Sequence, residues 1–384
     1  MLKRFYKIFL EAQGNVLHCR AHSHHPWPDI TREAHLRYWD DSARLAEAKW
    51  EQVLGEVLAE AQSHVARHIV HPRPRSIAFA PNSHELVARL YSCLDWSKPL
   101  HIVTTGSEFS SFARQTRRLE ETDRVKVTRV AVEPYPSFAL RFLAALRQPC
   151  DMVFLSHTFF DSGFVVRDLP AIVAAVPERA IIAIDGYHAF MALPVDISTI
   201  AQRVFYLGGG YKYAQAGEGA CFLASPPSAQ HRPIYTGWFA ERETGSAPLG
   251  QPIAYGLDAM RFWGSTFDAS GIYRLNAVMR LLQAVKVDAE SIHRHVVQLQ
   301  TRFLDGLTKL RLAALPMSGL TPAREFPRGN FCAFELSDAA QLQARLAEKE
   351  VLVDHRSHRL RFGFGVYHDA ADIDRLLERL RTLE

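Results

Sequence analysis

Short apolar runs alternate with helical patterns between residues 76 and 225. The runs are continuous and rich in β-branched residues, which is typical of strands buried on both faces, and the helical patterns supply the crossovers that parallel strands need. We therefore predict a mostly parallel sheet with helices on both faces, whose ligands bind at the carboxyl ends of the strands. The expected strands are 76–80, 100–105, 125–132, 152–156, 180–184, 204–207 and 220–224.

Helical spacing predicts the helices between these strands, and the residues after 225 predict a long helix and a smaller α/β unit. Crossover helices are expected at 84–94, 137–146, 169–176 and 188–200. A turn-rich stretch, 225–264, then precedes a long helical pattern over 270–312. The rest predicts strands 330–336 and 359–364, a helix at 338–350 that Ser337 can cap, and a last helix with Ile373, Leu376, Leu377 and Leu380 on one face.

These patterns divide the chain into three expected parts. Residues 1–55 form an N-terminal segment that packs with the small domain and the rim of the site. Residues 56–264 form a large domain, and residues 265–384 form a long connecting helix and a small C-terminal α/β domain.

Composition excludes several classes of protein. The 384 residues carry 45 basic and 41 acidic side chains, and no basic stripe with interleaved aromatics occurs, so we expect no nucleic-acid partner. No apolar run approaches the roughly 20 residues that cross a bilayer, and the first residues lack a signal-type apolar stretch. We therefore expect a cytoplasmic protein without a membrane partner. Its five scattered cysteines indicate reduced core thiols.

Lysine is scarce within this composition, and its position is informative. The chain has 36 Arg but nine Lys, and Lys212 is the only lysine between Lys126 and Lys286. Lys212 leaves the 204–207 strand through three glycines, while Asp185 ends the preceding apolar run. A carboxylate there is costly to desolvate without a cationic partner, and a lysine from the next strand reaches the same crevice.

A pyridoxal phosphate enzyme needs this pair of residues. It uses a lysine amine that bonds to the cofactor's aldehyde and a carboxylate that keeps the pyridine nitrogen protonated. We predict that Lys212 and Asp185 have these roles, and that His188 bonds to the cofactor or to the carboxylate.

The same residues carry a family resemblance. Asp185-Gly-Tyr-His188, followed by Tyr211-Lys212-Tyr-x-x-Ala-Gly217, resembles the fold-type-I pyridoxal phosphate enzymes of the class V aminotransferase group, and most closely the kynureninases. The similarity runs in order through residues 14–384, although Gly210 replaces the family's Ser. It implies an aspartate aminotransferase-like α/β fold with a seven-stranded sheet in the large domain, an amino acid substrate, and a homodimer with shared active sites.

Other segments resemble the family's cofactor contacts. Asn82 and Ser83 correspond to a phosphate-binding turn, although either residue could simply cap the helix that follows. Phe109 corresponds to the aromatic residue that stacks on the pyridine ring, whereas Phe112 replaces the family's Asp. Tyr211 carries over as a phosphate ligand through its hydroxyl.

Two later segments of the chain resemble the corresponding family segments less closely. Trp238 lies in a segment that contributes to the pocket in the family. Gly264-Ser265-Thr266 departs from the kynureninase pattern and resembles other class V members, in which the hydroxyl of the residue matching Thr266 reaches the phosphate across the dimer interface.

The terminal strand and the N-terminal histidines supply the expected substrate contacts. Arg359 and Arg361 share a strand face, and the resemblance selects Arg361 for the substrate carboxylate, a task that suits a guanidinium. The tract from His18 to Pro28 matches a rim loop of the active site, so His24 or His25 is expected to touch the substrate. The same histidines could instead bind zinc, although two prolines disrupt helical ligand spacing and no metal is expected.

The resulting functional prediction is an enzyme of amino acid metabolism, within tryptophan catabolism. It hydrolyses the Cβ–Cγ bond of kynurenine or a related aryl-keto amino acid to an aromatic acid and alanine. A class V aminotransferase that uses the same residues is the alternative. A metal-dependent hydrolase built on the histidine tract is a third reading.

Overall fold

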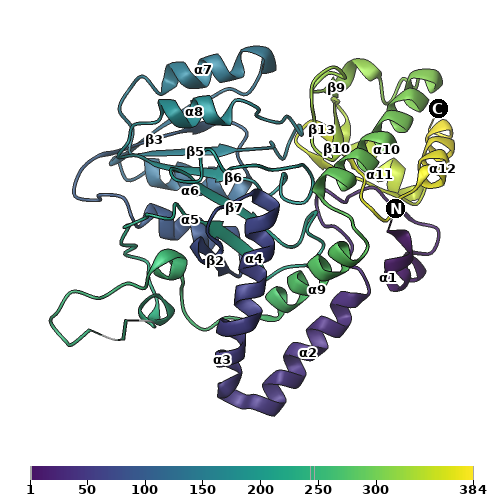
Figure 1. Cartoon of the computed structure of the whole chain (residues 1–384). Coiled ribbons are helices and arrows are strands. Elements are labelled where there is room, and N and C mark those ends of the chain that lie inside the picture. Colours follow the sequence, from purple (N-terminus) through teal and green to yellow (C-terminus); the bar gives the residue numbers. More distant parts are fainter. Residues whose placement is uncertain (1, 243, 246, 384) are drawn as a thin grey trace.

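A seven-stranded sheet forms the centre of the larger part of the molecule (Figure 1). The computed structural model describes residues 2–242, 244–245 and 247–383. The strand order is β2-β8-β7-β6-β5-β3-β4, and only β8 runs against its neighbours, so the mostly parallel sheet is confirmed. The strands are β2 (Ile77–Ala80), β3 (Leu100–Thr105), β4 (Val125–Val130), β5 (Met152–Ser156), β6 (Ile181–Asp185), β7 (Phe205–Gly209) and β8 (Cys221–Ala224).

Helices cover both faces of this sheet, as the continuous apolar strands require. In Figure 1, α7 and α8 lie over one face, whereas α4 and α5 lie over the other. Every residue of β2, β5, β7 and β8 is buried. The helices of this part are α4 (Leu58–Ile69), α5 (Ser83–Tyr91), α6 (Ser110–Glu120), α7 (Phe138–Ala145) and α8 (Leu169–Ala175).

The C-terminal part has its own sheet and apolar core. The sheet has the antiparallel order β12-β13-β10-β9 and packs with the last helices (Figure 1). Near it, β1 (Leu17–His18) pairs with β11 (Val351–Leu352), which ties the N-terminal segment to this part. The remaining elements are β9 (Leu320–Thr321), β10 (Phe331–Glu335), β12 (Asp354–Arg356), β13 (Arg359–Gly363), α9 (Ser270–Ala284), α10 (Ala289–Leu310), α11 (Ala339–Glu348) and α12 (Ala370–Arg381).

Three details of the expected secondary structure are wrong. Residues 188–200 form turns instead of a helix, because Pro194 cannot continue one and Met191 has a φ of +60°. The helix over 270–312 is two helices, since Lys286 has a φ of +55° and Asp288 caps α10 through the Ser291 amide. Ser337 does not cap α11, whose N-cap position is Asp338.

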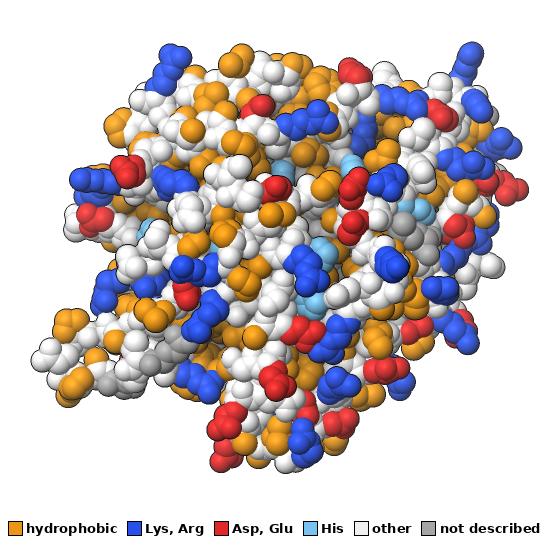
Figure 2. Space-filling view, viewed as in Figure 1, with side chains coloured by type: hydrophobic (Ala, Val, Ile, Leu, Met, Phe, Trp, Pro, Cys, Tyr) orange, Lys and Arg blue, Asp and Glu red, His pale blue; other side chains and the backbone are white. Residues whose placement is uncertain are grey.

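Before the sheet, the chain runs through α1 (Lys7–Gln13), α2 (Ile30–Leu45), α3 (Lys49–Gln52) and a π-helical turn, Val53–Val57, that leads into α4. No helix in the described ranges combines the length and apolarity that a membrane span needs. All five cysteines are free thiols. Figure 2 shows basic and acidic side chains interspersed over the visible face.

Candidate active site

A crevice at the carboxyl ends of β5, β6 and β7 brings together six residues predicted from the sequence. These are Ser83, Phe109, Asp185, His188, Tyr211 and Lys212. Four other residues complete its lining, Ser156, Thr158, Phe160 and Tyr187. The location agrees with the rule that ligands of a parallel sheet bind at the strand ends.

Glycines shape the two loops that present the reactive side chains. Gly186, next to Asp185, lies so close to Tyr206 that a Cβ would overlap the tyrosine ring. Gly217, beyond Lys212, has a φ of +71°, and its added Cβ would overlap the Trp27 indole. Both positions therefore require glycine, for close packing in the first case and for close packing and backbone conformation in the second.

Lys212 is buried in the crevice as an amine that loses its proton easily. Its Nζ lies 2.7 Å from His188 Nε2 and 5.5 Å from the centre of the Phe109 ring. Burial lowers the pKa of Lys212, Asp185 opposes the shift and the Arg361 charge adds to it, so that the resulting pKa is about 7. A large fraction of Lys212 is therefore a neutral amine near pH 7.

His188 is neutral in the same environment, because burial and the nearby Lys212 charge lower its pKa well below the usual value. A neutral imidazole that accepts a hydrogen bond from Lys212 Nζ on Nε2 carries its own hydrogen on Nδ1. That Nδ1 is buried and has no hydrogen-bond partner among the described residues. The crevice thus holds an unused donor beside the amine.

Asp185 ends β6, whose neighbour β7 leads into the loop that carries Lys212. Its Oδ1 accepts a hydrogen bond from the Tyr187 amide at 2.8 Å. Burial raises the pKa of Asp185, while that hydrogen bond and the Lys212 charge lower it. A cationic ring nitrogen in the crevice would give this carboxylate a full counter-charge.

The donor set fits pyridoxal phosphate. The crevice offers a carboxylate for a protonated pyridine nitrogen, an amine for an aldehyde, and the Phe109 ring for stacking. Two of its buried polar atoms, His188 Nδ1 and Thr158 Oγ1, lack partners in the described structure. A polar, acceptor-rich group would satisfy both.

Other predicted contacts do not line this crevice. Asn82 caps α5 by accepting from the Glu85 amide at 3.0 Å. Trp238 is 50% exposed, and Thr266 lines a separate cavity with Arg89. His25 is 2% exposed and packs against Tyr6 and Tyr367. The substrate contact expected for His25 therefore has no support in the geometry.

Arg361 lies in a buried ionic cluster that the sequence did not reveal. Its guanidinium pairs with Asp354 through Nε, at 3.0 Å, and Nη2, and also bonds to the carbonyl of Phe160, which lines the crevice. His22 Nε2 donates to the same Asp354 at 2.8 Å. Arg359 instead pairs with Asp161 and Glu133. Of the two arginines, Arg361 is the one held against a crevice residue.

The N-terminal histidines have separate partners. His18 bonds to Tyr367, His22 bonds to Asp354, and the His24 ring lies over Tyr211. Within residues 2–242, 244–245 and 247–383, no three His, Cys, Asp or Glu side chains gather in a way that could hold a metal ion. The zinc reading therefore gains no support from the structure.

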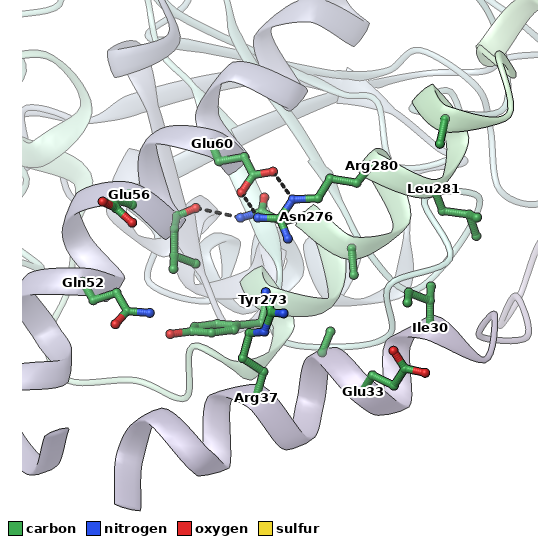
Figure 3. Close-up of a pocket in the computed structure, with 14 residues that line it drawn as sticks. Ile30, Glu33, Arg37, Gln52, Glu56, Glu60, Tyr273, Asn276, Arg280 and Leu281 are labelled. Atoms are coloured by element: carbon green, nitrogen blue, oxygen red, sulfur yellow. Dashed lines mark hydrogen bonds and ion pairs between the residues drawn. The ribbon is translucent and has the colours of Figure 1, made fainter. Parts of the chain in front are cut away.

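A groove of about 450 Å³ lies among α2, the π-helical turn and α9 (Figure 3). The Glu60–Arg280 ion pair crosses it, and Asn276 Nδ2 donates to the Val57 carbonyl of the π-helical turn. The groove contains no lysine or histidine and shares no residue with the crevice. Its polar contacts serve helix packing.

Comparisons with known proteins agree with this geometry. Residues 37–376 match the family Aminotransferase class-V. Kynureninase from Pseudomonas fluorescens is 27% identical over 226 residues, 57% of this chain and 52% of the kynureninase, so the chain spans about half of that relative. Isopenicillin N epimerase from Streptomyces clavuligerus is 26% identical over 376 residues, 92% of each chain.

A solved structure has the same fold. A mutant of C-DES with glycine covalently linked to its PLP cofactor superposes with a TM-score of 0.83 at 18% identity, covering 99% of this chain and 98% of the other. The expected fold-type-I architecture is thereby confirmed. Because the family match covers most of its length, the chain belongs to the class V aminotransferases, whose cofactor is pyridoxal phosphate.

Proposed function

We propose that this class V enzyme hydrolyses the Cβ–Cγ bond of kynurenine or a related aryl-keto amino acid, releasing an aromatic acid and alanine. The observation that carries the proposal is the Lys212 amine, in contact with His188 inside the crevice that also contains Asp185. The lysine-loop motif and the kynureninase relative support this reaction.

Bound pyridoxal phosphate supplies a ring that withdraws electrons from the substrate's α-carbon. Lys212 would take the α-proton of the bound substrate on Nζ, because its lowered pKa leaves free amine at pH 7. His188 holds Nζ in place through its Nε2. Asp185 keeps the pyridine nitrogen protonated, and Phe109 stacks on the ring.

Hydroxyl groups and a guanidinium hold the charged ends of the ligands in this proposal. Ser83 and Tyr211 bind the cofactor phosphate, and Ser83 has the added favourable field of the α5 N-terminus. Arg361, whose Nη1 bonds to the carbonyl of the crevice residue Phe160, would bind the substrate carboxylate. A water molecule then adds to the side-chain carbonyl, and the Cβ–Cγ bond breaks.

We further propose that the enzyme is a cytoplasmic homodimer. Ile234, Leu249 and Leu257 are exposed large apolar side chains, and the described parts of the chain between them protrude from the body (Figures 1 and 2). A second copy would cover this surface. It would also give Trp238 and Thr266, which lie outside the crevice of their own chain, a place beside the partner's cofactor.

The test is to incubate purified enzyme with pyridoxal phosphate and L-kynurenine and to assay anthranilate and alanine. Equimolar anthranilate and alanine are expected. Exchange of amino groups between alanine and an oxo acid, without anthranilate, would assign the chain to the aminotransferase alternative, which the Gly264-Ser265-Thr266 segment favours. Activity that depends on zinc and not on pyridoxal phosphate would support the hydrolase reading instead.

A further inference from the structure

A buried carboxyl group without an assigned role lies behind the cofactor crevice. Glu108 precedes Phe109 and is 3% exposed. Its Oε1 lies 2.7 Å from Thr105 Oγ1 and 3.2 Å from the Ser156 backbone nitrogen, and its Oε2 lies 2.5 Å from Ser156 Oγ. Glu108 forms no ion pair with any described residue. A charge at this position would have no counter-charge.

The surroundings of Glu108 favour its neutral form. Burial raises its pKa, the Ser156 and Thr105 hydrogen bonds oppose the shift, and Asp185 on β6 adds to it. The resulting pKa is about 8. Tyr91 on α5, a further titratable group that interacts with Glu108, is itself buried with a raised pKa. Neither neighbour supplies a positive charge. Glu108 therefore carries its proton at pH 7.

The hydrogen bonds locate that proton. Thr105 Oγ1 accepts from the Ser107 amide at 3.2 Å, so its own hydrogen goes to Glu108 Oε1, which also accepts from the Ser156 amide. Oε2 therefore carries the proton. An ionised Glu108 would accept the Ser156 hydroxyl hydrogen on Oε2, whereas a protonated Glu108 donates to Ser156 Oγ. In the protonated state the Ser156 hydrogen is free to point elsewhere.

Ser156 lines the crevice that would hold the cofactor. It pairs in register with Asp185 on the neighbouring strand, and it lines the crevice with Lys212. A free hydroxyl hydrogen at this position is a donor inside a site that must hold a phosphate ester with several acceptor atoms.

We propose that Glu108 is a positioning residue that acts as a neutral acid: it donates its proton to Ser156 and thereby leaves the Ser156 hydroxyl as a hydrogen-bond donor to the bound cofactor. The inference rests on the cofactor site of the proposed function, but not on the reaction catalysed there. Loss of the Glu108 proton reverses the Ser156 hydroxyl and places a second negative charge beside Asp185. Both changes weaken binding of an anionic cofactor.

The magnitude follows from linkage between proton and cofactor binding. A site that binds the cofactor only with Glu108 protonated loses affinity about tenfold for each pH unit above the Glu108 pKa. With that pKa at about 8, the cofactor dissociation constant should rise about tenfold between pH 7 and pH 9 from this group alone.

The test measures cofactor binding in a Lys212→Ala background, in which the covalent bond and the lysine titration are absent. Dissociation constants for pyridoxal 5'-phosphate are measured by equilibrium dialysis between pH 7 and pH 9 for Lys212→Ala and for Lys212→Ala/Glu108→Gln. Glutamine keeps an acceptor and a donor but does not ionise, and the cofactor's own titrations cancel in the comparison. Equal affinities at pH 7 and a tenfold advantage of the double variant at pH 9 are expected.

Equal pH dependence of the two proteins would overturn the inference. Ser156→Ala in the same background tests the donor separately: it should weaken binding at pH 7 by about three- to tenfold, the loss expected for one hydrogen bond. Unchanged affinity in that variant would refute the donor role, even if Glu108→Gln failed to fold. A chain that binds no pyridoxal phosphate at any pH would overturn this inference and the proposed function together, whereas a chain that binds it without cleaving kynurenine would overturn only the latter.

Discussion

Replacing Asp354 by asparagine should destabilise the protein far more than the same change in an exposed ion pair. Asp354 accepts hydrogen bonds from Arg361 and from His22, and all three side chains are buried. Burial lowers the His22 pKa to about 4, so His22 is a neutral donor at pH 7. Arg361 is the charge that Asp354 neutralises. In Asp354→Asn the guanidinium remains buried without a counter-charge.

The expected cost follows from desolvation of that charge. Removing one partner of a buried ion pair costs about 3–5 kcal/mol of unfolding free energy. Replacing both partners, in Asp354→Leu/Arg361→Met, should recover most of this loss because no charge is then buried. Burial opposes ionisation of Asp354, but His22 and Arg361 outweigh it and hold its pKa far below the usual value. Since the folded-state pKa is depressed, this stabilisation is present above about pH 5 and is lost as the pH falls further.

The assay is urea unfolding of the cofactor-free protein at pH 7, followed by circular dichroism. Asp374→Asn is the matched control, because Asp374 pairs with Arg302 at 2.7 Å while the two side chains are 52% and 49% exposed. That variant should lose little or no unfolding free energy, because water already screens the exposed pair. Hydrogen exchange of the β13 amides gives a local measure of the same effect. Equal losses of unfolding free energy in Asp354→Asn and Asp374→Asn would refute the role of burial.

Four further outcomes are expected. Lys212→Ala should abolish the borohydride-sensitive absorbance of the bound cofactor and lower turnover by at least about 10²-fold, as read in absorbance spectra and the anthranilate assay. In the wild type, the rate of covalent cofactor attachment should rise with pH through the Lys212 pKa of about 7 and level off roughly one pH unit above it, where the amine is almost fully neutral, as stopped-flow absorbance would show. Phe109→Leu should weaken cofactor binding by about two- to tenfold through lost stacking, measured by equilibrium dialysis. Gly217→Ala should lower the melting temperature more than Gly245→Ala, because both glycines have a positive φ, of +71° and +72°, but only Gly217 lies against Trp27.

Each of these expectations has a contradicting result. Lys212→Ala protein that keeps the borohydride-sensitive absorbance would exclude Lys212 as the covalent site. An attachment rate that falls between pH 6 and pH 7 would contradict a free-amine nucleophile. Unchanged affinity in Phe109→Leu would remove Phe109 from the cofactor's contacts, and equal losses in the two glycine variants would show that contact with Trp27 does not matter.

Local pattern determined much of the fold. The continuous apolar runs predicted all seven strands of the central sheet, because strands buried on both faces leave a compositional signature in the sequence. The same rule placed Asp185 and Lys212 together, since parallel neighbouring strands end at one edge. The helix predicted at 188–200 was wrong, because the apolar spacing there is helical but Pro194 cannot continue a helix.

Only the tertiary structure decided which charges and hydroxyls meet. Asp354 and His22 are 332 positions apart in the chain, yet they enclose Arg361 in one buried cluster. Glu108 and Ser156 are 48 positions apart and meet behind the crevice. No periodicity records such contacts, because they depend on which strands are neighbours and on which side chains lose their water. The sequence by itself determined the sheet, the lysine and its carboxylate; packing decided the protonation states around them.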